Sequence, residues 1–379
     1  MKNLVLTIFS LLFLSSGLVA QEYTIGFSSK TFRDADRRNR RVNARIYYPI
    51  SNNTSQSVNE QFPVIVLGHG FIMGSDAYQN FYDTLVPQGY IVVFVNTEGS
   101  IFANHIAYSE DLAFMVNAVQ QENDNSSSVL YQSVADKTAL IGHSMGGGAA
   151  TVAASLVEVE TLVTFAPAQL RFDTLTPASE VTEDAIVFSG SGDAVTPANE
   201  DHIPIYNSLG ANCKYFINIL GGAHCYYANS NFACDFGENS SSGNIQITRQ
   251  EQQEIVFGYL NSWFAYKLKN DTSAQEQFIS DLSSDAIDYE NGCLENNQTT
   301  IIDQNPTVVI SPNPTTRKIT IGTKNSNTFE KVEFYNQQGI LIHTSYNKET
   351  YTSQIQSGNY ILKIFTKKGI TTKQLVVKN

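Results

Sequence analysis

Residues 139–148 read ALIGHSMGGG and place the pattern G-x-S-x-G between an apolar run and a stretch of small residues. This pattern is typical of a sharp strand-to-helix turn that lifts a serine hydroxyl above the edge of a sheet. Glycine two positions before and two positions after the serine lets the flanking backbone pack closely. The stretch therefore predicts a strand that ends before Ser144, a helix over 147–156, and Ser144 as a candidate nucleophile.

Apolar strands and helices alternate on both sides of this stretch. The predicted strands cover 63–67, 90–96, 161–165, 184–188 and 215–220, and the predicted helices cover 76–88, 108–121 and 251–268. Such alternation is typical of a doubly wound, mainly parallel sheet with helices on both faces. The sequence therefore predicts the α/β fold class.

Two later loops carry the acid and the base that a serine nucleophile needs. Asp193 comes just past the predicted strand 184–188, and His224 follows two glycines after the strand 215–220. The order Ser, Asp, His is similar to that of α/β-hydrolases. In that arrangement His224 takes the serine proton and Asp193 orients the imidazole. Asp193 can also cap a helix near Pro197, and the two roles are compatible.

Other acidic residues and histidines fit these roles less well. Asp173 and Asp201 do not follow a clean strand end, and His202 stands in a helix-like run, where we expect a surface or packing histidine. His69 has no acidic or histidine partner at metal-ligand spacing. The sequence contains no P-loop and no dinucleotide fingerprint, so we expect no metal and no cofactor.

Two backbone amides are candidates for an oxyanion hole. One belongs to the residue after the nucleophile, Met145. The other belongs to the loop after an early strand, GHGF at 68–71, where we expect the amide of Phe71 to be the donor.

The N-terminus predicts export. Residues 1–20 have a basic start at Lys2, an apolar core over 4–14, and Ala20 before the cleavage point, as in a secretory signal peptide. The apolar core is too short to span a membrane, and no later stretch is long and apolar enough. We therefore expect a soluble, exported protein.

An even number of cysteines in an exported chain suggests disulfides. The cysteines are Cys213, Cys225, Cys234 and Cys293. They allow three pairings, of which we prefer Cys225 with Cys234, the pair closest in sequence, leaving Cys213 for Cys293. The first bridge would close a small loop beside His224 and hold the base in place. The loop contains Tyr226, Tyr227 and Phe232. We expect these aromatic residues to form either a wall of the substrate cleft or a separate packing cluster.

Charge divides the chain into two different parts. Residues 21–306 hold 13 Lys and Arg against 33 Asp and Glu, whereas 307–379 hold 10 Lys and Arg against 3 Glu. Between them, LENNQTTIIDQNP at 294–306 is polar and ends in Asn-Pro, as expected of a linker. We therefore expect a catalytic domain over 21–293 and a second domain over 307–379. The acidic first part argues against nucleic acid as a partner.

The C-terminal part alternates short β-rich runs with turn signals, which predicts a small all-β sandwich. The runs cover 307–310, 318–321, 331–335, 340–344, 360–365 and 373–377. The strings SPNP at 311–314, GNYILKI at 358–364 and KQLVVK at 373–378 resemble the C-terminal sorting domain of proteins exported by the type IX secretion system of Bacteroidetes. The resemblance implies a cargo tag, often removed by proteolysis, that delivers the protein outside the cell or to its outer surface. A carbohydrate-binding or adhesive sandwich is the alternative.

An arginine-rich stretch over 33–45 precedes the first predicted central strand. Clustered arginines can bind phosphate, but the alternating strand that follows favours a charged turn between two edge strands.

Four motifs make the resemblance of the first part more specific than its fold. They are GHSMGGG at 142–148, GDAVTP at 192–197, IPIYN at 203–207 and GGAH at 221–224. Together they look like the polyester hydrolase and cutinase-like branch of the dienelactone-hydrolase-related α/β-hydrolases. The resemblance covers about 23–293.

This resemblance implies roles for six residues. It implies that Ser144, Asp193 and His224 form a catalytic triad. It also implies that Phe71 and Met145 supply the oxyanion amides and, with His143, contact the substrate. Polyester hydrolases usually have Trp at the position of His143 and an aromatic residue within 166–170, where this chain has APAQL. The resemblance therefore implies ester hydrolysis without implying activity on aromatic polyesters.

The sequence as a whole predicts a secreted serine hydrolase of carboxylic esters that works through an acyl-enzyme. A peptidase or an acetyl-sugar esterase on the same fold is an alternative, because a fold does not determine its substrate. A surface-displayed binding protein is a further alternative, against which the complete Ser, Asp and His set speaks. We expect a monomer whose partners are a small or polymeric ester and the type IX secretion machinery.

Overall fold

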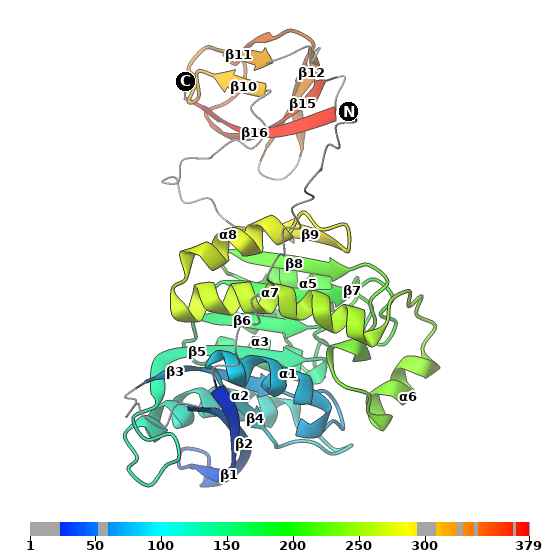
Figure 1. Cartoon of the computed structure of the whole chain (residues 1–379). Coiled ribbons are helices and arrows are strands. Elements are labelled where there is room, and N and C mark those ends of the chain that lie inside the picture. The colour runs from blue at the N-terminus through cyan, green and yellow to red at the C-terminus, as the bar shows by residue number, and fades with distance from the viewer. Residues whose placement is uncertain are drawn as a thin grey trace, which may run out of the picture. The chain divides into compact units, whose positions relative to one another are not determined.

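The computed structural model describes residues 23–51, 60–293, 308–323, 329–336, 340–366 and 369–378 (Figure 1). The chain divides into two compact units, one ending at Glu295 and the other beginning at Asn296. Each unit has its own apolar core. The predicted signal peptide at 1–20 and the predicted linker at 294–306 lie outside the described residues.

The first unit is built on a nine-stranded sheet in the order β1-β2-β4-β3-β5-β6-β7-β8-β9. Strands β3 to β8 are parallel to one another, whereas β1, β2 and β9 pair in antiparallel fashion at the two sides. The strands are β1 (Tyr23–Asp34), β2 (Arg40–Ser51), β3 (Phe62–Gly68), β4 (Ile91–Val95), β5 (Val134–His143), β6 (Thr161–Phe165), β7 (Ala185–Gly190), β8 (Lys214–Ile219) and β9 (Ile287–Asn291). The predicted α/β class with a mainly parallel sheet is confirmed.

Helices cover both faces of this sheet, so its central strands are apolar on both sides. In β3, Val64 and Val66 join the core under one layer of helices, and Ile65 and Leu67 join the core under the other. The helices are α1 (Gln79–Leu85), α2 (His105–Gln120), α3 (Met145–Ala154), α4 (Leu175–Ala178), α5 (His202–Ser208), α6 (Phe232–Ser240), α7 (Arg249–Lys269) and α8 (Thr272–Asp281). No helix in the described ranges is long and apolar enough to cross a membrane.

The helix predicted over 76–88 is divided into three short helices. They are η1 (Ser75–Tyr78), α1 (Gln79–Leu85) and η2 (Val86–Gln88). Pro87 lies near the start of η2, where its missing N–H removes the hydrogen bond that would continue α1 as an α-helix. Gly89, with φ 82°, then ends the segment in a left-handed conformation that glycine adopts easily.

The arginine-rich stretch includes a turn from which two arginines reach a buried carboxylate. Of the two edge strands predicted beside this turn, β1 lies at the edge of the sheet. The prediction was wrong for β2, which pairs with both β1 and β4. Arg37 and Arg40 both bind the buried carboxylate of Asp111 on α2, at 2.7 and 2.6 Å. Arg40 also binds Glu98 at 2.8 Å. The arginines therefore fasten the β1–β2 turn to α2.

The second unit consists of two small antiparallel sheets that enclose one core. One sheet has the order β10-β11-β14 and the other β13-β12-β15-β16. The strands are β10 (Val308–Ser311), β11 (Lys318–Thr323), β12 (Phe329–Tyr335), β13 (Leu341–Ser345), β14 (Glu349–Tyr351), β15 (Gly358–Thr366) and β16 (Gly369–Val377). The all-β architecture predicted for this part is confirmed, and β14 is an additional short strand.

Candidate active site

Ser144 lies on a tight turn between β5 and α3. Its backbone angles, φ 56° and ψ −123°, are strained for a residue with a side chain. A Cβ added at Gly142 would lie 2.1 Å from the Gly146 carbonyl oxygen, and one added at Gly146 would lie 2.3 Å from the Gly68 carbonyl oxygen. The two glycines of the motif are thus required by backbone that passes too close for any side chain.

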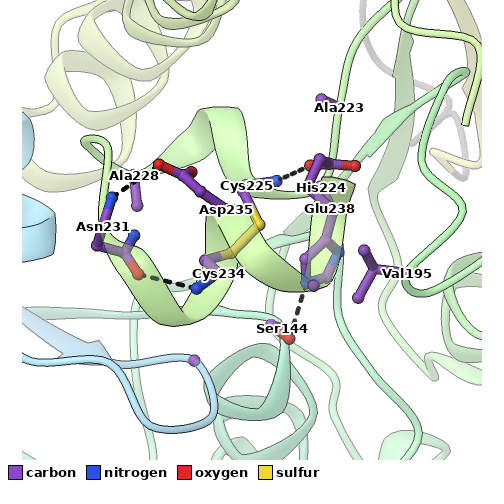
Figure 2. The surroundings of a disulfide bond; sticks show 12 residues. Ser144, Val195, Ala223, His224, Cys225, Ala228, Asn231, Cys234, Asp235 and Glu238 are labelled. Atoms are coloured by element: carbon purple, nitrogen blue, oxygen red, sulfur yellow. Dashed lines mark hydrogen bonds between the residues drawn. A yellow bond between two sulfur atoms is a disulfide. The ribbon is translucent and has the colours of Figure 1, made fainter. Parts of the chain in front are cut away.

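The structure brings Ser144, His224 and Asp193 together from three strand ends. The His224 Nε2 atom lies 3.0 Å from the Ser144 Oγ atom. A dashed line marks this hydrogen bond in Figure 2. The His224 Nδ1 atom lies 2.8 Å from Asp193 Oδ2. Both the histidine and the aspartate are buried, whereas Ser144 is partly exposed. The arrangement can pass a proton from the serine to an imidazole that a carboxylate holds in place.

Asp193 is fixed by the turn that it begins. Its Oδ1 atom accepts hydrogen bonds from the amides of Val195 and Thr196, at 2.8 and 2.9 Å. Burial raises the pKa of Asp193, but attraction to His224 and these hydrogen bonds outweigh it and leave the pKa below its usual value. The helix α5 starts only at His202, so Asp193 caps a turn rather than the helix expected near Pro197.

The rival acids Asp173 and Asp201 have other partners. Asp173 Oδ1 accepts from the amides of Leu175 and Thr176 at the start of α4. Asp201 Oδ1 accepts from the Gln169 amide at 2.7 Å. Neither carboxylate hydrogen-bonds His224.

Thr196, which the sequence did not single out, and His202, which it gave only as a weaker rival to His224, are polar neighbours of Asp193 and His224. The Thr196 Oγ1 atom lies 2.8 Å from His224 Nδ1 and 3.0 Å from His202 Nε2. His202 has no exposed surface, so of the surface and packing positions that we expected for it, it takes the packing position. The turn at 193–196 creates these contacts, and no periodic pattern in the sequence records such a turn.

The two candidate oxyanion donors lie next to the nucleophile and on the loop after β3. Met145 is the first residue of α3, where the N–H has no partner within the helix. In the described part of the chain, neither the Met145 amide nor the Phe71 amide donates a hydrogen bond to a protein group. Both amides are therefore free to bind a developing negative charge. The side chain of Phe71 is 40% exposed, whereas that of Met145 is buried.

His143 is buried, although we expected its side chain to contact the substrate. Burial and the neighbouring His224 lower the pKa of His143 to about 3, so the ring is neutral at pH 7. Its Nε2 atom lies 2.9 Å from the His224 carbonyl oxygen, which can only accept, and its Nδ1 atom lies 2.9 Å from the Tyr78 hydroxyl. The Tyr78 hydroxyl therefore donates to Nδ1, and its oxygen accepts from the Gly70 amide at 2.8 Å. His143 therefore connects the loop of the base with the loop that carries Phe71.

His69 is a buried structural residue. Its Nδ1 and Nε2 atoms lie 2.8 and 2.7 Å from the carbonyl oxygens of Gly70 and Thr97. Burial, the largest effect, lowers the pKa of His69. Within the described ranges, no group of three or more His, Cys, Asp or Glu residues is arranged to hold a metal ion.

The loop of the base is fastened at Cys225, the residue after His224. Cys225 forms a disulfide with Cys234 of α6 (Figure 2), as we preferred from sequence spacing. Cys213 pairs with Cys293. The Cys225 amide donates to Glu238 Oε2 at 2.6 Å, and its carbonyl oxygen accepts from Arg249. The backbone around the base is thus held by a covalent bond and by two charged side chains.

The aromatic residues of this loop lie in three different environments, and the expected wall of the substrate cleft stays a prediction. Tyr227 is buried and packs at 5.5 Å from Phe165, which is a core contact. Phe232 is 87% exposed on α6 and lies 6.1 Å from Phe236, one helical turn further on. Tyr226 packs beneath the guanidinium of Arg249 at 4.6 Å.

Comparisons with known proteins match both units. A family model described as PET hydrolase-like matches residues 26–240, and a model of the secretion system C-terminal sorting domain matches residues 309–378. The chain is also similar to Cutinase est1 of Thermobifida alba, with 22% identity over 183 residues, which cover 47% of this chain and 56% of the relative. The chain thus spans little more than half the length of that relative. The sorting domain indicates export by the type IX system to the outside of the cell or to its surface.

Proposed function

Because the chain belongs to the PET hydrolase-like family, whose model matches residues 26–240, we propose that it is a serine hydrolase of carboxylic esters that works through an acyl-enzyme. The observation that carries this proposal is the row of contacts from Ser144 Oγ to His224 Nε2 and from His224 Nδ1 to Asp193 Oδ2. Similarity to a cutinase supports esters as the substrate class.

In the first step Ser144 attacks the ester carbonyl carbon while His224 Nε2 takes the hydroxyl proton. The 3.0 Å contact between these atoms is within the reach of a general base. Asp193 holds the Nδ1–H of His224 and stabilises the imidazolium that forms. The strained backbone of Ser144 holds its hydroxyl at the end of the sheet, so little reorganisation precedes attack.

The negative charge of the tetrahedral intermediate develops on the former carbonyl oxygen. The amides of Met145 and Phe71 would stabilise it, helped by the positive N-terminal end of α3. His224 then gives its proton to the leaving alcohol, which leaves an acyl group on Ser144. A water molecule, activated by the same histidine, hydrolyses that ester and restores the free serine.

The experiment measures hydrolysis of p-nitrophenyl esters of two to sixteen carbons by the full chain and by Ser144→Ala. We expect the variant to lose several orders of magnitude in kcat, because triad members act as a unit. A preference for short or middle chains supports a cutinase-like esterase, and a preference for long chains supports a lipase. Equal rates in the two proteins at every chain length would refute the proposal.

Labelling by a fluorophosphonate separates an enzyme from a binding protein. The reagent reacts with an activated serine, so the wild-type chain should be labelled and Ser144→Ala should not. Labelling of Ser144 without ester hydrolysis would favour a peptidase. No labelling would favour a binding role.

A further inference from the structure

Three buried polar side chains form a row behind the carboxylate of Asp193. Ser189 lies near the end of strand β7, Thr196 ends the turn that Asp193 begins, and His202 is the first residue of α5. The Ser189 Oγ atom lies 2.9 Å from His202 Nδ1, and the Thr196 Oγ1 atom lies 3.0 Å from His202 Nε2 and 3.2 Å from Asp193 Oδ2. Ser189 and His202 have no exposed surface, and Thr196 is 8% exposed.

The protonation of His202 limits how these groups can bond. Burial lowers the pKa of His202 to about 4, so the ring is neutral at pH 7 and carries one N–H. If that hydrogen is on Nε2, Ser189 donates to Nδ1, His202 donates to Thr196, and the Thr196 hydroxyl donates to Asp193. If the hydrogen is on Nδ1, His202 donates to Ser189, and its Nε2 atom accepts from the Thr196 hydroxyl. The lone pairs of the Thr196 oxygen then face the carboxylate.

The charge of Asp193 favours the first arrangement. A carboxylate oxygen only accepts hydrogen bonds, and bonds to an ionised acceptor are stronger than neutral ones. In this arrangement Oδ1 accepts from two backbone amides and Oδ2 accepts from His224 and Thr196. Every O–H and N–H hydrogen of the row is then donated to an acceptor, without placing another charge in the core.

We propose that Thr196 and His202 are positioning residues, which fix and stabilise the Asp193 carboxylate through a Ser189 → His202 → Thr196 → Asp193 series of hydrogen bonds. This inference rests on the proposed function, since it assigns to the row the task of holding the acid that orients His224. Thr196 acts directly on the Asp193–His224 pair, because its hydroxyl lies 3.2 Å from the carboxylate and 2.8 Å from His224 Nδ1. His202 acts one step behind it, by fixing the direction in which that hydroxyl donates.

Matched variants of the full chain separate this role from simple packing. Thr196→Val removes the hydroxyl and keeps the shape, whereas Thr196→Ser keeps the hydroxyl. His202→Leu removes the ring nitrogens, whereas His202→Gln keeps an N–H donor near the position of Nε2. We expect Thr196→Val and His202→Leu to lower kcat about 10-fold to 100-fold, which corresponds to the loss of one hydrogen bond to the charged Asp193 carboxylate, with KM changed less than about twofold. Thr196→Ser and His202→Gln should restore most of kcat.

The control for folding is urea unfolding of each variant, so that only folded proteins are compared. Wild-type kcat in folded Thr196→Val and His202→Leu would overturn the proposal. So would a kcat for Thr196→Ser or His202→Gln as low as that of its apolar counterpart, because a lost hydrogen bond would then not be the cause.

A ¹⁵N NMR spectrum of the histidine-labelled wild-type chain tests the row without any substrate. The His202 signals, identified by their loss in His202→Gln, should show the Nε2–H tautomer at pH 7. The Nδ1–H tautomer would overturn the proposal. If wild-type chain and Ser144→Ala hydrolyse esters equally, the proposed function fails, and the tautomer still decides whether the row donates to Asp193.

Discussion

Lowering the pH from 7 to 5 should destabilise the first unit through two buried histidines. His143 is 1% exposed and His202 has no exposed surface, and burial is the main reason that their pKa values fall to about 3 and about 4. In the unfolded chain a histidine has a pKa of about 6.5. Below that pH the unfolded chain binds two protons that the folded chain does not, so the free energy of unfolding falls as the pH falls.

The size of the effect follows from the unfolded histidines. At pH 5 both rings are still neutral in the folded protein, whereas each is almost fully protonated in the unfolded chain. Linkage then gives a loss of about 2 kcal/mol per histidine between pH 7 and pH 5, or about 4 kcal/mol for the pair. This stability is fully present above about pH 6.5 and is lost progressively down towards the folded pKa values.

The assay is urea unfolding at the two pH values, followed by the fluorescence of Trp263 with the disulfides intact. Trp263 is the single tryptophan of the chain and is buried in the first unit, so it reports on that unit alone. His202→Gln removes one of the two titrating groups and should lose about 2 kcal/mol less than the wild type between pH 7 and pH 5. The matched control is His343→Gln, an exposed histidine of the second unit, which should lose as much as the wild type. Equal losses in wild type and His202→Gln would refute the reasoning.

Three further outcomes can be measured with the same assays. Ser144→Ala should keep the wild-type free energy of unfolding within about 1 kcal/mol while losing hydrolysis, and a large loss of stability would show that the kinetic test reports on folding. Gly142→Ala should prevent correct folding, since its Cβ would lie 2.1 Å from a carbonyl oxygen, whereas Gly237→Ala, inside α6 with no atom within 4 Å, should unfold at the wild-type urea concentration or slightly above it, because alanine favours a helix. Replacing Cys225 and Cys234 together by Ser opens a bridge of sequence separation 9, which should cost about 2.5 kcal/mol by chain entropy; an unchanged urea midpoint would contradict the assignment of that bridge as a stabilising crosslink.

The fold and the positions of Ser144, Asp193 and His224 could be predicted because each follows a strand whose apolar run is visible in the sequence. Parallel strands end at one edge of the sheet, so residues that follow them meet there. The same logic placed Phe71 after β3 and Met145 after the nucleophile.

The neighbours of these residues could not be predicted in this way. Thr196 and His202 reach Asp193 through a turn held by side-chain-to-amide bonds, and Tyr78 reaches His143 from 65 residues away. Likewise, the partner of Arg37 and Arg40 is Asp111, on a helix 74 and 71 positions further along. Such contacts depend on how loops and helices pack, and they have no period or spacing in the sequence. The strand β14 escaped prediction because it has only three residues.

The hydrogen bonds of His143 limit how the two loops on either side of it can change during evolution or engineering. A single ring holds the carbonyl oxygen of His224 on one side and, through Tyr78, the amide of Gly70 on the other. A substitution that reshapes the loop of Gly70 and Phe71 therefore also disturbs the loop of His224, and the reverse holds as well. The two loops therefore have to be redesigned together, because His143 is bonded to both of them.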